Sequence, residues 1–138
     1  MKHPLHFFAV ILPAVSLFFC GCAVSGKITD FNKKSTFVSS IYLEEPGTLK
    51  IHDGQALRQV RLTKVKLLRI SADVTKIINR ELYYLAEIQF KDGEIAGSMD
   101  DKRVKAYVSV NYRLFGLAQG NDYSIMLNDV TKIEFGIR

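Results

Sequence analysis

Polar and apolar residues alternate along much of the chain beyond residue 37, with the period of two that is typical of β-strands. Residues 48–52 alternate in this way and are followed by Asp53-Gly54, a dipeptide typical of hairpin turns. Every second residue of 104–114 is apolar, so this segment predicts one strand with a buried face. The same reasoning predicts strands in both halves of 57–70 and at 82–90, 123–127 and 132–137.

Turn residues separate these segments. Asp92-Gly93 and Gly120-Asn121 are typical turn dipeptides, and Pro46 lies in a Glu45-Pro46-Gly47 turn. We therefore expect a mostly β domain, built as a small antiparallel sandwich or barrel.

One segment also fits a helix. Val74, Ile77, Ile78, Leu82 and Leu85 would lie on one face of a helix near 73–85, and the domain would then be α+β. The strand interpretation instead places a turn at Asn79-Arg80-Glu81. We favour strands here because the rest of the chain has β periodicity.

Two stretches of the chain resemble each other. Residues 60–70 and 125–135 carry apolar residues at the same first, third, sixth, ninth and eleventh places. Both patterns are typical of a strand that ends, crosses two polar residues and re-enters the core at a valine. They predict two similar β units, although apolar residues are common enough here for chance matching to remain an alternative.

The first residues have a different pattern. Lys2 provides a positive start, and 7–19 is nearly all apolar, interrupted by Pro13 and Ser16. This run is shorter than the roughly 20 residues that a membrane-spanning helix needs. A short positive start, a short apolar run and then small residues indicate a secretory signal peptide.

The end of this segment reads Phe19-Cys20-Gly21-Cys22 and resembles the lipobox of bacterial lipoproteins, with Phe19 in place of the usual leucine. The resemblance covers 1–22 and implies cleavage before Cys22, lipid on that cysteine and attachment to a membrane. Ala23 follows instead of aspartate, which implies the outer membrane, facing the periplasm, if the host is Gram-negative. Cleavage after Ala23 and an uncleaved anchor are the alternatives.

These assignments divide the chain into a signal peptide over 1–21, a lipidated cysteine with a flexible tether over 22–36, and one β-rich domain over 37–138. Part of the tether region has an alternative as an early strand, because Ile28 and Phe31 are apolar. Both cysteines lie at the signal boundary, so the domain is expected to contain no internal disulfide. Its stability must then come from an apolar core.

The sequence offers few candidate catalytic residues. His52 is the only histidine beyond the signal, and its neighbour Asp53 would point to the opposite side of a strand. No nucleophile-elbow pattern occurs, so we expect no enzyme, and a hydrolase is the least favoured class. The acidic stretch 92–101 lacks EF-hand spacing, so we expect a solvated loop, and no metal or cofactor site.

Basic residues give one candidate contact surface. No acidic residue occurs from 54 to 72, and Arg61, Lys64, Lys66 and Arg69 lie within this range. We expect a solvated basic face, whose candidate role is contact with an anionic ligand or a partner. The export signal argues against nucleic acid as that partner.

The function that the sequence favours is a lipid-anchored envelope protein that acts as a non-enzymatic binding or assembly module. Its partners would be the membrane, through the N-terminal lipid, and another envelope protein, joined by strand addition to an exposed edge. The alternative is a binder of a small ligand or an anionic envelope polymer through the basic sheet face.

Overall fold

The computed structural model describes residues 24–54, 56–101 and 103–137, and these form one antiparallel β-sheet. The strands are β1 (Val24–Asp30), β2 (Ser35–Leu43), β3 (Thr48–Asp53), β4 (Ala56–Arg61), β5 (Val65–Ile78), β6 (Glu81–Phe90), β7 (Ile95–Ala96), β8 (Ala106–Ser109), β9 (Arg113–Ala118), β10 (Asn121–Met126) and β11 (Val130–Phe135). Two 3₁₀ turns, η1 (Leu62–Lys64) and η2 (Leu127–Asp129), precede β5 and β11. The mostly β fold class is confirmed.

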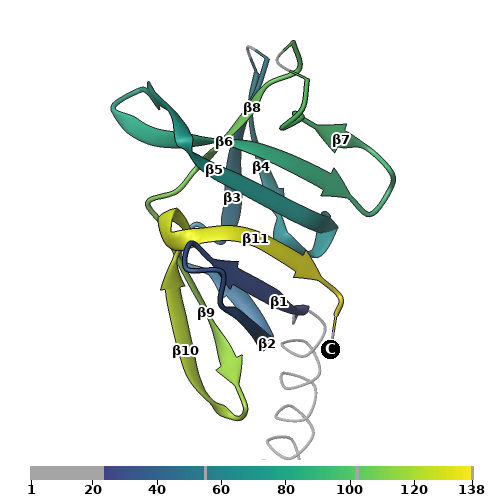
Figure 1. The fold of residues 1–138 in the computed structure, drawn as a ribbon, viewed down its shortest axis with the longest axis vertical. Coiled ribbons are helices and arrows are strands. Elements are labelled where there is room, and N and C mark those ends of the chain that lie inside the picture. The colour runs from purple at the N-terminus through teal and green to yellow at the C-terminus, as the bar shows by residue number, and fades with distance from the viewer. Residues whose placement is uncertain (1–23, 55, 102, 138) are drawn as a thin grey trace, which may run out of the picture.

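The sheet is curled, and its strand order is β10-β9-β2-β1-β11-β5-β6-β8-β3-β4, with β7 beside β6. In Figure 1, β11 runs across the middle of the molecule, with β4, β5, β6 and β8 above it, β3 running down behind β5 toward it, and β1, β2, β9 and β10 below. The order divides at the β11–β5 pair into two halves of five strands each. β4 and β10 are the terminal strands of this path.

The two halves are copies of one unit. η1 and η2 both follow the second strand of a hairpin and lie 65 residues apart, at Leu62 and Leu127. The residues before them, Arg61 and Met126, have φ/ψ of −75°/144° and −74°/141°, and the residues after them, Val65 and Val130, have −99°/134° and −97°/137°. The two similar β units predicted from the sequence are therefore present.

Backbone hydrogen bonds extend the match beyond the repeated stretch. Lys91 N–H donates to the Lys64 carbonyl at 3.0 Å, and Phe31 N–H donates to the Asp129 carbonyl at 3.0 Å. Phe90 likewise bonds to Glu94 at 2.8 Å, as Asp30 bonds to Lys34 at 2.9 Å. The first unit contains β3, β4, β5, β6 and β8, and the second contains β9, β10, β11, β1 and β2. β6 and its turn in the first unit thus correspond to β1 and its turn in the second. The second unit is therefore assembled from both ends of the chain.

A pseudo-two-fold axis passes between β5 and β11. Their antiparallel register pairs Leu68 with Ile133, which occupy equivalent places in the two units. Both side chains are 0% exposed, and they belong to one apolar core that the two units share. The curl of the sheet wraps each unit around its part of this core.

The helix alternative for 73–85 is wrong. β5 runs to Ile78, β6 begins at Glu81, and the two are paired in one hairpin. Asn79 and Arg80, with φ of 52° and 66°, form the two-residue turn that the strand interpretation placed here. The apolar residues that suggested a helix lie near this turn, and Ile77 is 73% exposed instead of packed on a core face.

The prediction of a flexible tether is also wrong for residues 24–36, the part of it that the structure describes. β1 is paired with β11 on one side and with β2 on the other, and Ile28 is 1% exposed. The alternative of an early strand is confirmed. The polar residues that suggested a tether lie on strand faces and in the turn before β2, where water reaches them.

The single strand predicted over 104–114 is interrupted. β8 ends at Ser109 and β9 begins at Arg113, and between them the chain passes from the first unit to the second. Val108, Val110 and Leu114 are all 0% exposed, so the apolar alternation marks burial correctly without marking the break. Alternation reports which side chains meet the core and not which strands they join.

Candidate functional site

A cluster of polar groups lies on the outer face of the first unit, around Glu81. The hairpin turn at Asn79-Arg80 places Glu81 at the start of β6, beside the end of β8. Its carboxylate lies 3.2 Å from Lys50 Nζ and accepts hydrogen bonds from the hydroxyls of Ser109 and, at 3.2 Å, Tyr112. Ser109 is 0% exposed. The cluster therefore joins β3, β6, β8 and the crossover between the units.

The charges of this cluster are stabilised by their neighbours. Burial of Glu81 acts to raise its pKa, but hydrogen bonds from Ser109 and Lys50 and the Lys50 charge outweigh it, so the pKa lies below its ordinary value. The pKa of Lys50 is raised by hydrogen bonding to Tyr112 and Glu81. Both groups thus stay charged at neutral pH, and neither is poised to exchange a proton there. This favours a structural role, which no spacing in the sequence indicated.

His52 and Asp53 do not form a catalytic pair in this geometry. Asp53 Oδ2 lies 3.6 Å from Arg58 Nη2, across the β3–β4 hairpin. A depression of about 440 Å³ nearby is lined by Asp53, Gly54, Lys76, Arg103, Val104, Lys105 and Tyr107, without His52. Basic residues predominate there, and Lys76 Nζ lies over the Tyr107 ring, 5.2 Å from its centroid.

Part of the acidic stretch 92–101 is engaged in ion pairs. Glu94 Oε2 lies 3.0 Å from Arg58 Nη2, and Asp101 Oδ1 lies 3.2 Å from Arg103 Nε. Across the part of the chain that the structure describes, no group of three His, Cys, Asp or Glu residues is arranged to hold a metal ion. These contacts give two of the carboxylates a local structural role.

The four basic candidates do not line one common hollow. Arg61 and Lys64 line a groove of about 670 Å³ between β4 and the turn after β6. Arg69 lines another depression, with Lys132 and Asp73. Lys66 is exposed on β5 and lines neither hollow. The groove beside β4, which we call the β4 groove, thus brings together two of the four.

The β4 groove combines several chemistries. Its walls are Gln59, Val60, Arg61, Thr63, Lys64, Phe90, Lys91, Asp92 and Glu94. Arg58 contacts two of these residues. Its guanidinium lies 5.0 Å from the Phe90 ring centroid and also forms an ion pair with Glu94. The backbone of β4, a terminal strand, runs along one side. This arrangement can hold an extended chain with apolar and acidic side chains.

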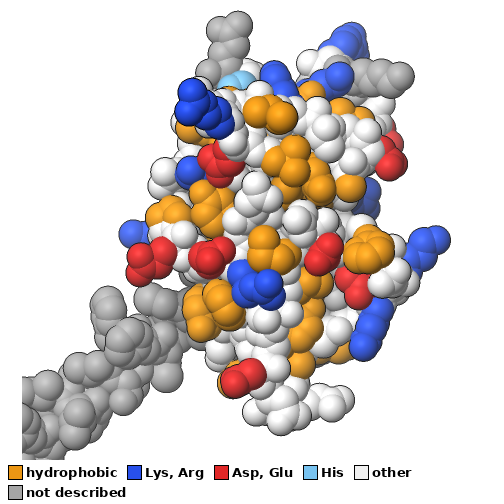
Figure 2. All heavy atoms as spheres, turned by 90° about the vertical axis from the view of Figure 1, so that its left-hand side faces the viewer, with side chains coloured by type: hydrophobic (Ala, Val, Ile, Leu, Met, Phe, Trp, Pro, Cys, Tyr) orange, Lys and Arg blue, Asp and Glu red, His pale blue; other side chains and the backbone are white. Residues whose placement is uncertain are grey.

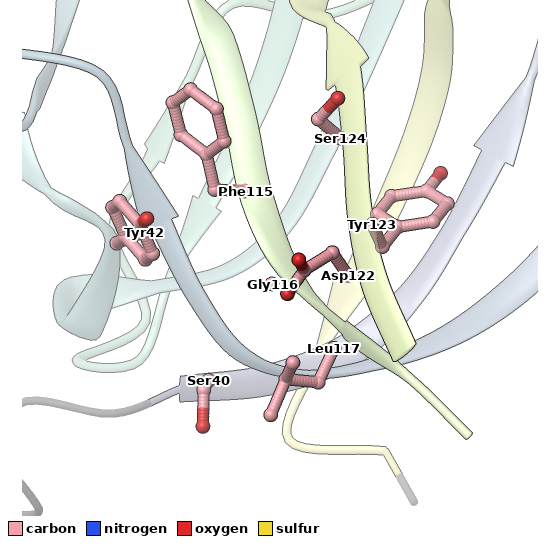
Figure 3. Close-up of a pocket in the computed structure, with 8 residues that line it drawn as sticks. All are labelled: Ser40, Tyr42, Phe115, Gly116, Leu117, Asp122, Tyr123 and Ser124. Carbon is pink, nitrogen blue, oxygen red and sulfur yellow. The ribbon is translucent and has the colours of Figure 1, made fainter. Parts of the chain in front are cut away.

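A depression of about 560 Å³ lies on the outer face of the second unit, where aromatic side chains lie beside the polar residues Ser40, Asp122 and Ser124 (Figure 3). Tyr42 from β2 and Phe115 from β9 stack there, with ring centroids 5.2 Å apart. A Cβ on Gly116 would lie 2.8 Å from the Ser39 carbonyl oxygen, so only glycine leaves the two strands this close. By the 65-residue spacing, Phe115 corresponds to Lys50. The second unit therefore has an aromatic side chain at the place where the first unit has a charged one.

We call this surface the aromatic face, and define it as Phe37, Tyr42, Phe115 and Leu117. Phe37 and Tyr42 are 53% and 60% exposed, although they are large apolar residues. Figure 2 shows the left-hand side of the molecule in Figure 1, where apolar areas lie among charges of both signs. Sequence reasoning missed the aromatic face because it depends on the β2–β9 pairing, which joins distant segments.

Cys22, the predicted lipidation site, lies outside the described residues. Among the residues that the structure does describe, no helix is long and apolar enough to cross a bilayer.

Comparisons with known proteins found no match, since no family model, curated protein or solved structure matches this chain. The functional argument therefore depends on the sequence and on the geometry described above.

Proposed function

We propose that this protein is a lipid-anchored module of the bacterial cell envelope that binds another envelope protein by strand addition along β4. The observation that supports this most is the β4 groove, which lies beside a terminal strand of the sheet. A terminal strand presents backbone N–H and C=O groups that can pair with an added chain. Side-chain pockets beside such an edge then give specificity.

The chemistry of the groove indicates the kind of chain that it accepts. Val60 is half-buried and provides apolar contact. Arg61, Lys64 and Lys91 provide positive charge, and of the two acidic residues in the lining, Asp92 and Glu94, Glu94 is paired with Arg58. An extended segment with alternating apolar and acidic side chains fits this arrangement, with the charges favouring encounter and register.

The anchoring half of the proposal depends on the lipobox resemblance at 19–22. Each buried CH₂ contributes about 0.8 kcal/mol, so more than one acyl chain on Cys22 would hold the domain durably at a membrane. If the host is Gram-negative, the outer membrane, with the domain in the periplasm, is the location that Ala23 favours. A domain held in this way needs only modest affinity, because the anchor concentrates it near membrane partners.

A crosslinking experiment in cells tests the binding half. A photo-crosslinking residue at Gln59 in β4 is expected to capture one specific envelope protein, whereas the same probe at Asn121 in β10 is not. Replacing Arg61 and Lys64 together by serine should weaken capture about tenfold or more, since two charged contacts near an interface are lost.

The matched control replaces Lys66 and Arg69, which lie outside the β4 groove, by serine. This variant is expected to capture the partner normally. Equal loss in both variants, or capture of anionic polymer in place of protein, would support the alternative of a broad basic binding face. Equal capture from Gln59 and Asn121 would refute strand addition at β4.

A further inference from the structure

We infer that the aromatic face rests on the lipid bilayer, so that the domain has a fixed orientation on the membrane. The inference depends on the proposed lipid anchor and adds the surface that the membrane contacts. It starts from the distance between the anchor and the sheet.

The chain leaves almost no slack between Cys22 and the domain. β1 begins at Val24 and is paired on both sides, so only Ala23 separates the lipidated cysteine from the folded sheet. Two residue steps span at most about 7 Å. A flexible tether would let the domain turn freely, but this link holds the beginning of β1 against the lipid headgroups.

The aromatic face lies at this beginning of β1. Val24 is paired with Ile41, the residue before Tyr42 in β2. Figure 3 shows β2 bending at Ser40 beside the start of β1, with Tyr42, Phe115 and Leu117 on the neighbouring surface. Leu117 is opposite Ser39, and Phe115 is opposite Tyr42, so the face is continuous across two strands.

The residue types fit a membrane interface. Phenylalanine and leucine lose contact with water when they enter the boundary between headgroups and acyl chains, and tyrosine places its hydroxyl at the headgroups. The stacked Tyr42–Phe115 pair is already ordered, so little side-chain freedom is lost on contact. Neutral lipid suffices for such a contact, because apolar burial drives it.

This orientation also leaves the β4 groove accessible. β4 and β10 are at opposite ends of the strand order, and in Figure 1 the unit with β4 lies above the unit with β9 and β10. With β2 and β9 on the bilayer, the first unit extends away from it. The membrane and the proposed partner therefore use different units of the pseudo-symmetric fold.

Tryptophan fluorescence tests the inference, because the chain contains no tryptophan of its own. Tyr42→Trp and Leu117→Trp place a single probe on the aromatic face, and Ile77→Trp places a control on a side chain that is 73% exposed in the other unit. Each full-length chain is expressed with its own signal, purified in detergent and reconstituted in phosphatidylcholine vesicles with brominated acyl chains.

Bromine should weaken the emission of both face probes about twofold or more, because an apolar face enters an interface to roughly 5–10 Å. The Ile77→Trp emission should be unchanged. The same quenching is expected at high salt and with added anionic lipid. Quenching that requires anionic lipid and low salt, or quenching equal at all three positions, would overturn the aromatic contact while leaving the anchor intact.

Failure of the anchor is distinguished by a second preparation. Chains that begin at Cys22 are coupled through that thiol to a maleimide lipid in the same vesicles, which supplies the short link chemically. Quenching confined to the two face probes supports the inference even if cells do not lipidate the protein. Its absence in coupled chains overturns the inference without bearing on lipidation in cells.

Discussion

Replacing Glu81 by glutamine removes the negative charge at the centre of the polar cluster while keeping the size of the side chain. The carboxylate bonds to Lys50, Ser109 and Tyr112, and only about a quarter of the Glu81 and Lys50 side chains is exposed, at 24% and 25%. Glutamine can accept through one oxygen only. If its amide group faces the two hydroxyls, Ser109 and Tyr112 must become acceptors, and if it faces Lys50, that contact is lost. In either orientation the Lys50 charge loses its negative partner.

The size of the effect follows from these contacts. A hydrogen bond to a charged group contributes about 1.5–3 kcal/mol, and a lysine left without its partner adds a desolvation cost. Partial exposure lets water compensate for some of this, so we expect Glu81→Gln to lower the free energy of unfolding by about 2–3 kcal/mol. For a domain of this size, that corresponds to roughly 8–12 °C in Tm.

Urea unfolding as a function of pH is the appropriate assay. Because the folded pKa of Glu81 lies below its ordinary value of 4.5, its stabilisation is present above that value and is lost as the pH falls through the folded pKa. The difference between wild type and variant should thus be constant near neutral pH and shrink in acid. The raised pKa of Lys50 has the opposite effect, with stabilisation lost above its ordinary value of 10.5.

The control is Glu45→Gln, at an exposed position in the turn before β3, and should change the free energy by less than about 0.5 kcal/mol. A Glu81→Gln protein as stable as wild type at pH 7 would refute this reasoning. A difference that stayed constant down to pH 2 would show that the lost interaction does not depend on the Glu81 charge.

Two further predictions concern the fold. Leu68→Ala and Ile133→Ala, at the pseudo-two-fold axis and both 0% exposed, should each cost about 3 kcal/mol in chemical denaturation; a difference above about 2 kcal/mol would contradict the equivalence of the units. Arg80→Gly should stabilise the protein by roughly 0.5–1 kcal/mol in thermal unfolding, because Arg80 has φ of 66° and glycine relieves the strain of this turn position. A lower Tm for Arg80→Gly would show that the arginine side chain contributes more than its backbone costs.

The strands and the repeat were predictable because they depend on local information. Alternation identified the buried faces of 48–52 and 82–90, and matching apolar places in 60–70 and 125–135 revealed the duplication. The correspondence between β1 and β6 was not predictable, because an insertion after β6 and the permuted chain order hide it. The tether assignment failed for a related reason, since β1 becomes a strand only through its partners β2 and β11.

The candidate surfaces were less predictable than the fold. Arg61 and Lys64 were identified as basic residues in a stretch without acids, but their separation from Arg69 became visible only with the geometry of the groove. The aromatic face and the Glu81 cluster each combine residues from strands far apart in the chain. No spacing within one segment indicates such contacts, because pairing between distant strands creates them.

The membrane attachment that is central to the proposal depends on lipid at one sulfur atom, and mass spectrometry of the N-terminal peptide measures this lipid directly. The protein is produced with its own signal in a bacterium that processes lipoproteins and is extracted from the membrane fraction. The account predicts a peptide that begins at Cys22 and carries the mass of a diacylglyceryl group. A peptide with an unmodified thiol at Cys22, or a mature protein that begins at Val24 and is recovered free in solution, would contradict it.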